Sequence, residues 1–142
     1  MTAAIPINFT ALSASELIAF AVLRQDEMGV GGLTESDITD ALTSGRAVVE
    51  TRPFGFAVIE QKPTADGKKM PHLWLLFVDQ QNRLRGLGRR FVRELLKRYA
   101  VDYHMSMYCS GARRRAFFGR LGFRIESQDG NMRRMTTNTE IK

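Results

Sequence analysis

The spacing of apolar residues in the C-terminal half of the chain predicts alternating strands and helices. A continuous apolar run over 73–78 is typical of a buried strand. The apolar residues that follow recur at helical intervals and predict an amphipathic helix: Leu87, Phe91, Val92, Leu95, Leu96 and Tyr99. A strand is expected over 103–109, followed by a second helix that ends at Gly122. Two paired strands, 123–127 and 130–136, then close the chain.

The N-terminal half is expected to begin with a strand and two capped helices. A short strand is predicted over 5–9. Ser13 is followed three residues later by Glu16, which predicts a capping box at the start of a helix that runs to about residue 28. After a glycine-rich turn, Thr34 predicts the start of a second helix, which a glycine ends.

A strand pair and a hairpin loop are expected between the two halves. Residues 47–51 and 54–61 alternate between apolar and polar side chains, as paired strands do. Residues 62–71 contain two prolines and an Asp-Gly pair, which predicts an exposed hairpin loop. With 142 residues, the chain is long enough for one domain over 1–142 but too short for two.

The junction between the strand over 73–78 and the following helix has the features of a phosphate site. Gly86 and Gly88 carry no Cβ, so a ligand can approach the main chain there. A helix N-terminus presents unpaired N–H groups and the positive end of the helix dipole. Four arginines surround the turn: Arg83, Arg85, Arg89 and Arg90. Together these features predict a cradle for pyrophosphate.

The motif at this junction narrows the choice of ligand. The Walker pattern is absent, and Phe91 stands where the third glycine of G-x-G-x-x-G would be. Residues 83–88 read R-x-x-G-x-G, which resembles the acetyl-CoA signature (Q/R-x-x-G-x-G/A) of the GNAT acetyltransferases. Residues 116–123 resemble a second segment of that family, which ends in [LF]-Y-x-x-x-G-F: Phe117, Gly122 and Phe123 match, and Phe118 stands in place of the tyrosine. With the strands and helices between them, the two matches cover about residues 72–128.

The resemblance implies an α/β (α+β) GNAT fold, with a mixed central sheet of about six or seven strands flanked by about four helices. It also implies acetyl-CoA as a co-substrate. In the family, a main-chain N–H of the strand before the cradle, splayed at a bulge, holds the thioester carbonyl, and that position is Phe77 or Val78 here. The residues expected to contact acetyl-CoA are Phe77, Val78, Arg83, Arg85, Gly86, Leu87, Gly88, Arg89, Arg113 and Phe118.

Two positions depart from the family pattern. The family often has a tyrosine beside the sulfur of CoA, where its hydroxyl can protonate the leaving thiolate, and this chain has Phe118 there. The family often has asparagine where this chain has Arg113, a change that is compatible with CoA phosphates. Tyr108 or Cys109, at the end of the preceding strand, or water could replace the missing acid. Because Cys109 is the only thiol and nothing marks it as a nucleophile, a direct attack in a ternary complex is expected.

The acceptor groove of the GNAT fold lies near the N-terminal helices and the hairpin strands. Acidic residues in these segments favour a cationic amine, although each could also be an ordinary solvated charge: Asp26, Glu27, Glu35, Asp37, Glu50 and Glu60. Histone-modifying members have a glutamate base six residues before the valine that ends the strand, and that position is His72 here. His72 follows the predicted loop, where surface histidines are common, so Glu60 and Glu50 are rival bases.

Composition and charge leave one competing class of function open. Residues 1–82 hold 6 basic and 10 acidic side chains, whereas residues 83–142 hold 15 basic and 5 acidic ones. The basic half suits a polyanion such as CoA, and it also suits nucleic acid, although no helix-turn-helix, zinc or RNP pattern is present. We assign no metal site. A single cysteine and the lack of a run as long as a membrane span favour a cytoplasmic protein.

The sequence therefore predicts an acyl-CoA-dependent N-acyltransferase that transfers acetyl to a primary amine on a small molecule or a protein. The catalytic candidates are His72, Glu60 and Tyr108. Two alternatives remain: a GNAT-fold module that binds CoA without turnover, and a basic nucleic-acid-associated protein. The acceptor is unassigned, and a homodimer is left open.

Overall fold

The computed structural model describes residues 7–63, 67, 69–79, 86–99, 105–109, 112–129 and 132–137. Its helices are α1 (Ala14–Leu23), α2 (Glu35–Thr43), α3 (Leu87–Tyr99) and α4 (Ala112–Gly119), with two short 3₁₀ helices, η1 (Phe9–Ala11) and η2 (Gln25–Met28). Its strands are β1 (Ala47–Arg52), β2 (Gly55–Pro63), β3 (Lys69–Val78), β4 (Met105–Cys109), β5 (Phe123–Asp129) and β6 (Met132–Thr137). Predictions for residues 80–85 and 100–104, including Arg83 and Arg85, lie outside the described residues.

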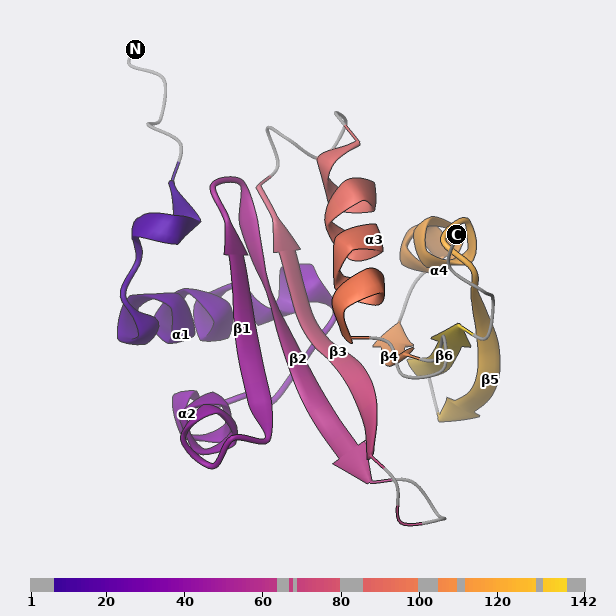
Figure 1. The fold of residues 1–142 in the computed structure, drawn as a ribbon, viewed down its shortest axis with the longest axis horizontal. Coiled ribbons are helices and arrows are strands. Elements are labelled where there is room, and N and C mark those ends of the chain that lie inside the picture. The colour runs from indigo at the N-terminus through magenta and orange to yellow at the C-terminus, as the bar shows by residue number, and fades with distance from the viewer. Residues whose placement is uncertain are drawn as a thin grey trace.

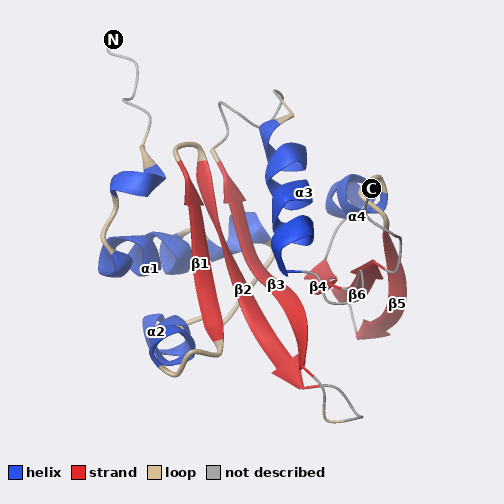
Figure 2. Ribbon diagram, in the orientation of Figure 1, coloured by secondary structure: helices blue, strands red, loops and turns tan. Residues whose placement is uncertain are grey.

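The described strands form one mixed sheet in the order β1-β2-β3-β4-β6-β5 (Figures 1 and 2). β1, β2 and β3 are antiparallel neighbours, as are β4, β6 and β5, and a parallel pairing of β3 with β4 joins the two sets. This arrangement confirms the predicted α/β class and mixed sheet. In the described part of the chain, no helix is long and apolar enough to cross a membrane.

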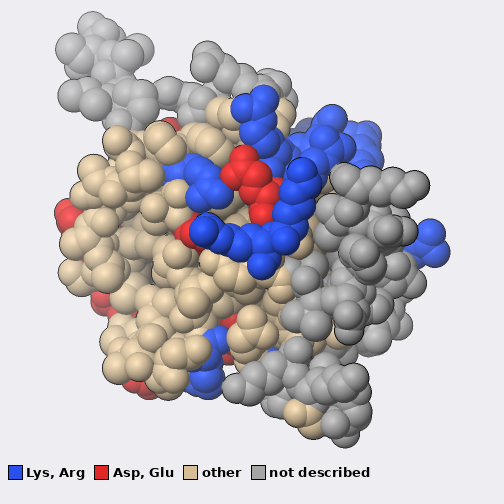
Figure 3. Space-filling model, in the orientation of Figure 1, with Lys and Arg blue, Asp and Glu red and all other residues tan. Residues whose placement is uncertain are grey.

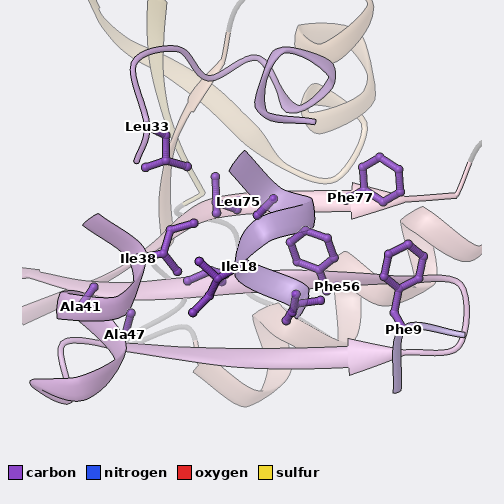
Figure 4. Packing of buried hydrophobic residues seen from close by; sticks show 12 residues of the cluster. Phe9, Ile18, Leu33, Ile38, Ala41, Ala47, Phe56, Leu75 and Phe77 are labelled. Atoms are coloured by element: carbon purple, nitrogen blue, oxygen red, sulfur yellow. The ribbon is translucent and has the colours of Figure 1, made fainter. Parts of the chain in front are cut away.

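Helices cover both faces of the sheet and enclose a separate core on each face. The first core lies under α3 and α4 and includes Phe91, Leu95 and Phe118. The second core lies under α1 and α2, where Phe9, Phe56 and other apolar side chains converge (Figure 4). Burial of these side chains is the main favourable term that holds the helices on the sheet.

A bulge in β3 sets which side chains of that strand point to which core. Val58 of β2 pairs with Leu75, but the next residue, Ile59, pairs with Leu73, so Trp74 is the extra residue. Because of this bulge, Trp74 and Leu75 both pack with the core under α1 and α2, whereas Leu73 packs with the other core. The bulge therefore turns Trp74 towards the α1 and α2 side.

Local sequence signals locate the helix starts well. Ser13 and Thr34 both form capping boxes, with Glu16 and Asp37 as their respective partners, and the first was predicted in full. The helix that starts after Ser13 is shorter than predicted, because α1 ends at Leu23 and a 3₁₀ helix follows.

Two predicted boundaries are wrong. The described part of the strand expected over 5–9 is not a strand: the Asn8 side chain caps η1, and the Phe9 N–H donates to the carbonyl of Pro53 at 3.2 Å. The loop expected over 62–71 is shorter, because β2 and β3 stay paired as far as Pro63 and Lys69. Cross-strand pairing therefore overrides the loop signal of the prolines.

Candidate functional site

The site is built where β3 and β4 separate. The two strands are paired at His72–Ser106 and Leu73–Met107. β3 continues to Val78, and no further pair with β4 is formed among the described residues. A cavity of about 510 Å³, the first cavity, opens there. It is lined by Glu27, Met28, Leu73, Trp74, Leu76, Phe77, Val78, Gly88, Met107, Arg113, Arg114, Phe117 and Phe118.

The N-terminus of α3 forms one wall of the first cavity. The Gly86 carbonyl accepts the first helical hydrogen bond, from the Arg90 N–H at 3.1 Å, and Gly86 has φ +74°, a conformation that favours glycine. Gly88 is buried, and a Cβ there would lie 3.5 Å from Val78 Cγ2. The first-turn N–H groups of α3 and the positive end of its dipole thus lie beside the cavity, as an anion site requires.

The structure brings together most of the described residues that were expected to bind acetyl-CoA. Phe77, Val78, Gly88, Arg113 and Phe118 line the first cavity. The others that can be placed lie at the start of α3: Gly86, Leu87 and Arg89, the last of which is exposed. The bulge is at Trp74, three residues before the first position expected to donate to the thioester carbonyl.

Phe118, at the position where a tyrosine was expected from the resemblance, belongs mainly to the core. Its side chain is 5% exposed. Its ring lies edge-on to those of Phe117 and Phe123, with centroid distances of 5.0 and 5.5 Å. Phe118 therefore supplies an apolar surface to the cavity and no proton. The Tyr108 side chain lies outside the described part of the structure, although its main chain is in β4.

A second cavity, of about 390 Å³, lies on the α1 and α2 side of the sheet. Three carboxylates and one arginine are among the residues that line it. The full lining is Val30, Gly31, Gly32, Leu33, Asp37, Asp40, Arg46, Glu60 and Trp74. Trp74 lines both cavities, so the two cavities are neighbours at this residue. The Glu60 side chain is only 15% exposed, and Arg46 Nη1 lies at 3.7 Å and Lys62 Nζ at 3.8 Å from its carboxylate oxygens.

The acidic residues expected around an acceptor groove do not all lie there. Asp37 and Glu60 line the second cavity, and Glu27 lines the first. Glu50 was expected in the groove and as a rival base, and this is wrong, because it lies on the opposite face and pairs with Arg98 of α3. That pairing raises the pKa of Arg98. Burial, followed by the hydrogen bond to Glu50, raises the pKa of Tyr99.

Charged side chains also gather over α3 on the face shown in Figure 3. Arg52 of β1 donates to Glu94 of α3 at 2.8 Å, and its guanidinium lies 4.8 Å from the centre of the Phe91 ring. The ion pairs Arg52–Glu94 and Arg98–Glu50 both connect α3 to β1, although the partners are far apart in the sequence. They are separate from the residues that line the two cavities.

His72 is not at the end of a loop, as expected, but inside β3. Its side chain is 2% exposed, and its Nδ1 lies 2.8 Å from the Ser106 hydroxyl of β4. It stands opposite Glu60 in the β2–β3 register, so both side chains are on the α1 and α2 side of the sheet. Glu60 reaches a cavity, whereas His72 is absent from the described lining of both.

Sequence reasoning missed Trp74, Asp40 and Arg114, all of which line a cavity. Trp74 was hidden inside an apolar run, and its role depends on the bulge. Asp40 lies one helical turn after Asp37, a spacing that could have indicated a shared face of α2.

The fold can be compared with known proteins. No protein-family model matches the sequence, and no curated protein matches it. Solved structures do match. An acetyltransferase from Thermus thermophilus is 18% identical, with a TM-score of 0.60 over 86% of this chain and 88% of that chain. A GNAT family acetyltransferase from Elizabethkingia anophelis with acetyl-CoA bound is 13% identical, with a TM-score of 0.60 over 89% of this chain and 94% of that chain. The chain has the GNAT fold.

A third neighbour is bound to a bisubstrate analogue. Arabidopsis thaliana Naa50, in complex with the bisubstrate analogue CoA-Ac-MVNAL, is 12% identical, with a TM-score of 0.60 over 89% of this chain and 94% of that chain. At these identities the comparisons establish the GNAT fold and the resemblance to its acetyltransferases. The reaction and the acceptor of this chain are matters of proposal.

Proposed function

We propose that the chain is an acyl-CoA-dependent N-acyltransferase that transfers acetyl to a primary amine. The observation that carries this proposal is the first cavity, which opens between β3 and β4 beside the glycine-containing N-terminus of α3. The pyrophosphate of acetyl-CoA would bind the first-turn N–H groups near Gly86 and Gly88. The thioester arm would enter the cavity along β3, where a main-chain N–H of Phe77 or Val78 would donate to its carbonyl oxygen.

In the proposed reaction, a neutral amine attacks the thioester carbon, an N–C bond forms, and the C–S bond breaks. We propose Glu60 as the base that removes the amine proton, directly or through water, because it is the candidate that lines a cavity. His72, which is buried on the neighbouring strand at the position paired with Glu60, is the alternative. The thiolate is protonated by water, Tyr108 or Cys109, since Phe118 has no proton to donate. A thiol with a pKa near 8.5 leaves tolerably well as a thiolate.

The second cavity supports a cationic acceptor. Three carboxylates and one arginine line it, so its formal charge favours an ammonium group as the amine arrives. Because Trp74 lines both cavities, we propose that the amine approaches the thioester from the second cavity, past this residue. The Naa50 neighbour is bound to an analogue that joins CoA to a peptide. We therefore propose that peptide amino termini and small cationic amines are the acceptors to test first.

The test has two stages. Calorimetry with CoA asks whether the protein binds the co-substrate, and free-thiol release from acetyl-CoA with a panel of amines asks whether it transfers the acyl group. Arg89→Gln, at the start of α3, should weaken CoA more than dephospho-CoA. Lys97→Gln, at the other end of the same helix, is the matched control and should leave both unchanged. If Arg89→Gln loses nucleic-acid binding while its CoA affinity stays intact, this arginine binds a nucleic acid and not CoA.

A second candidate function is a CoA-binding sensor or interaction module. The observation in its favour is Phe118, which lies in the first cavity without the hydroxyl that a general acid needs. If the protein binds CoA but releases no thiol from acetyl-CoA with any amine of the panel, the binding module is favoured over the acyltransferase.

A further inference from the structure

The connection between α1 and α2, residues 24–34, contributes to both cavities. η2 supplies Glu27 and Met28 to the first cavity, and residues 30–33 supply one wall of the second. The Gln25 side chain holds this segment together from within. Its Nε2 donates to the carbonyl of Leu33 at 3.0 Å, and its Oε1 accepts from the Leu33 N–H at 2.7 Å. The internal shape of the connection is therefore fixed by its own hydrogen bonds. Its position relative to the sheet needs a separate contact.

Arg114 ties this connection to the opposite layer of the fold. It lies in α4, on the other side of the sheet from α1 and α2. Its Nη2 donates to the carbonyl of Glu27 at 2.6 Å and lies 3.4 Å from the carbonyl of Asp26. These carbonyls belong to η2, and carbonyl groups at the end of a helix attract cations. Since Arg114 and Glu27 both line the first cavity, the bond between them lies beside it.

Gly29 allows the guanidinium to come this close. A Cβ on Gly29 would lie 3.2 Å from Arg114 Nη1 and 3.3 Å from its Cζ. Gly29 also has φ +75°, which an L side chain rarely adopts. The arginine therefore packs flat against the main chain that follows η2, in addition to its hydrogen bonds.

We propose that Arg114 is a positioning residue, which holds the α1–α2 connection in place at the cavity and thereby determines how well the acceptor amine binds. This inference rests on the proposed acyltransferase function for its kinetic part only. The neighbouring Arg113 is exposed and is the arginine of α4 expected to contact CoA, whereas the hydrogen bonds described for Arg114 are to the connection between α1 and α2.

The first experiment compares Arg114→Met with Arg120→Met. Both remove a guanidinium from the region of α4 and keep an apolar stem, but Arg120 is exposed and follows the helix. In Arg114→Met, hydrogen–deuterium exchange of the amides in residues 24–34 should be faster by about tenfold, because the tie to α4 is lost. Exchange in β1 and β2 should be unchanged, and Arg120→Met should match the wild type throughout.

The kinetic readout uses spermidine and the peptide Met-Val-Asn-Ala-Leu as acceptor probes. Arg114→Met should raise the KM for the probe that the wild type acetylates by about tenfold, the loss expected of a charge-assisted hydrogen bond. The kcat and the Kd for CoA should each stay within about twofold. Arg114→Lys can still reach one carbonyl, so it should recover part of the acceptor KM.

A glycine pair isolates the contact from general strain. Gly29→Ala and Gly45→Ala both place alanine at a positive φ, +75° and +78°, but nothing lies within 4 Å of a Cβ at Gly45. Both should lose similar backbone stability, and Gly29→Ala alone should raise the acceptor KM and speed exchange in residues 24–34.

Three results would overturn the proposal. The first is unchanged amide exchange in Arg114→Met, and the second is an equal rise of the acceptor KM in Gly29→Ala and Gly45→Ala. The third is that Arg114→Met loses more affinity for CoA than for dephospho-CoA. The last would make Arg114 a phosphate ligand. If the wild type acetylates neither probe, the proposed function fails. The exchange data still decide whether Arg114 holds residues 24–34 in place, so the two hypotheses can fail separately.

Discussion

Gly88→Ala should stabilise the protein and weaken CoA at the same time. Gly88 is the second residue of α3, and its added Cβ would lie 3.5 Å from Val78 Cγ2 and 3.7 Å from Phe117 Cζ. These are ordinary van der Waals distances, so the fold accepts the methyl group. Alanine in place of glycine inside a helix raises the free energy of unfolding by about 0.5–1 kcal/mol.

The same methyl group would stand between the phosphates and the main chain of α3. The loss of one charge-assisted hydrogen bond costs about 1.5–3 kcal/mol, which raises the Kd for CoA by roughly tenfold to 150-fold. The two effects have opposite signs, so a general loss of folding cannot imitate the expected result.

Calorimetry with CoA and urea unfolding measure the two effects of Gly88→Ala on the same preparations. Gly119→Ala is the matched control, because Gly119 is also helical and nothing lies within 4 Å of its added Cβ. It should leave CoA affinity unchanged. If Gly88→Ala binds CoA as tightly as the wild type, or if Gly119→Ala loses affinity equally, the anion site is not at the start of α3.

Four further variants test the chemistry and the stability of the fold. Phe118→Tyr should raise the rate of thiol release by less than about tenfold, a barrier change under roughly 1.4 kcal/mol, and a much larger gain would indicate a chain that has lost its acid. Glu60→Gln should lower kcat by about a hundredfold or more, as expected when a positioned general base is removed, whereas His72→Gln should keep kcat and lower the free energy of unfolding by about 1–3 kcal/mol through its buried hydrogen bond; the reverse pattern would make His72 the base. Main-chain hydrogen bonds at the helix caps lower the pKa values of Glu16 and Asp37, so their stabilisation is present above the unfolded pKa values and is lost as the pH falls through the folded ones. Urea midpoints should therefore fall between about pH 5 and pH 2, and by less in a double variant with Gln and Asn at these positions.

The features that sequence predicted well depend on residues close together in the chain. The capping box at Ser13 involves a partner three residues away, and the amphipathic pattern of α3 is read from one helix. The turn at Gly86 and Gly88 is likewise local. For such features, the short-range hydrogen bonds and the side-chain spacing already contain the information.

The features that sequence did not predict depend on how distant strands pair. The burial of His72 requires Ser106, which comes from a strand 34 residues later. The position of Trp74 requires a register shift against β2. Glu50 faces α3 because β1 pairs with β2 in one register, and a shift of one residue would turn it to the other face. None of these registers can be read from a single strand.

The parallel pairing of β3 with β4, which the described residues show at His72–Ser106 and Leu73–Met107, has a consequence for how the chain folds. The hairpins β1–β2 and β2–β3 connect neighbouring segments, and so does β5–β6, so each can form early with little loop-closure entropy. The parallel pairing of β3 with β4 must wait for α3 to form between them. We therefore expect the two halves of the sheet to acquire structure separately and to join last along this narrow seam. A ligand bound across this pairing would stabilise the joined sheet. It would therefore lower the rate at which the two halves separate more than it changes the rate at which they form.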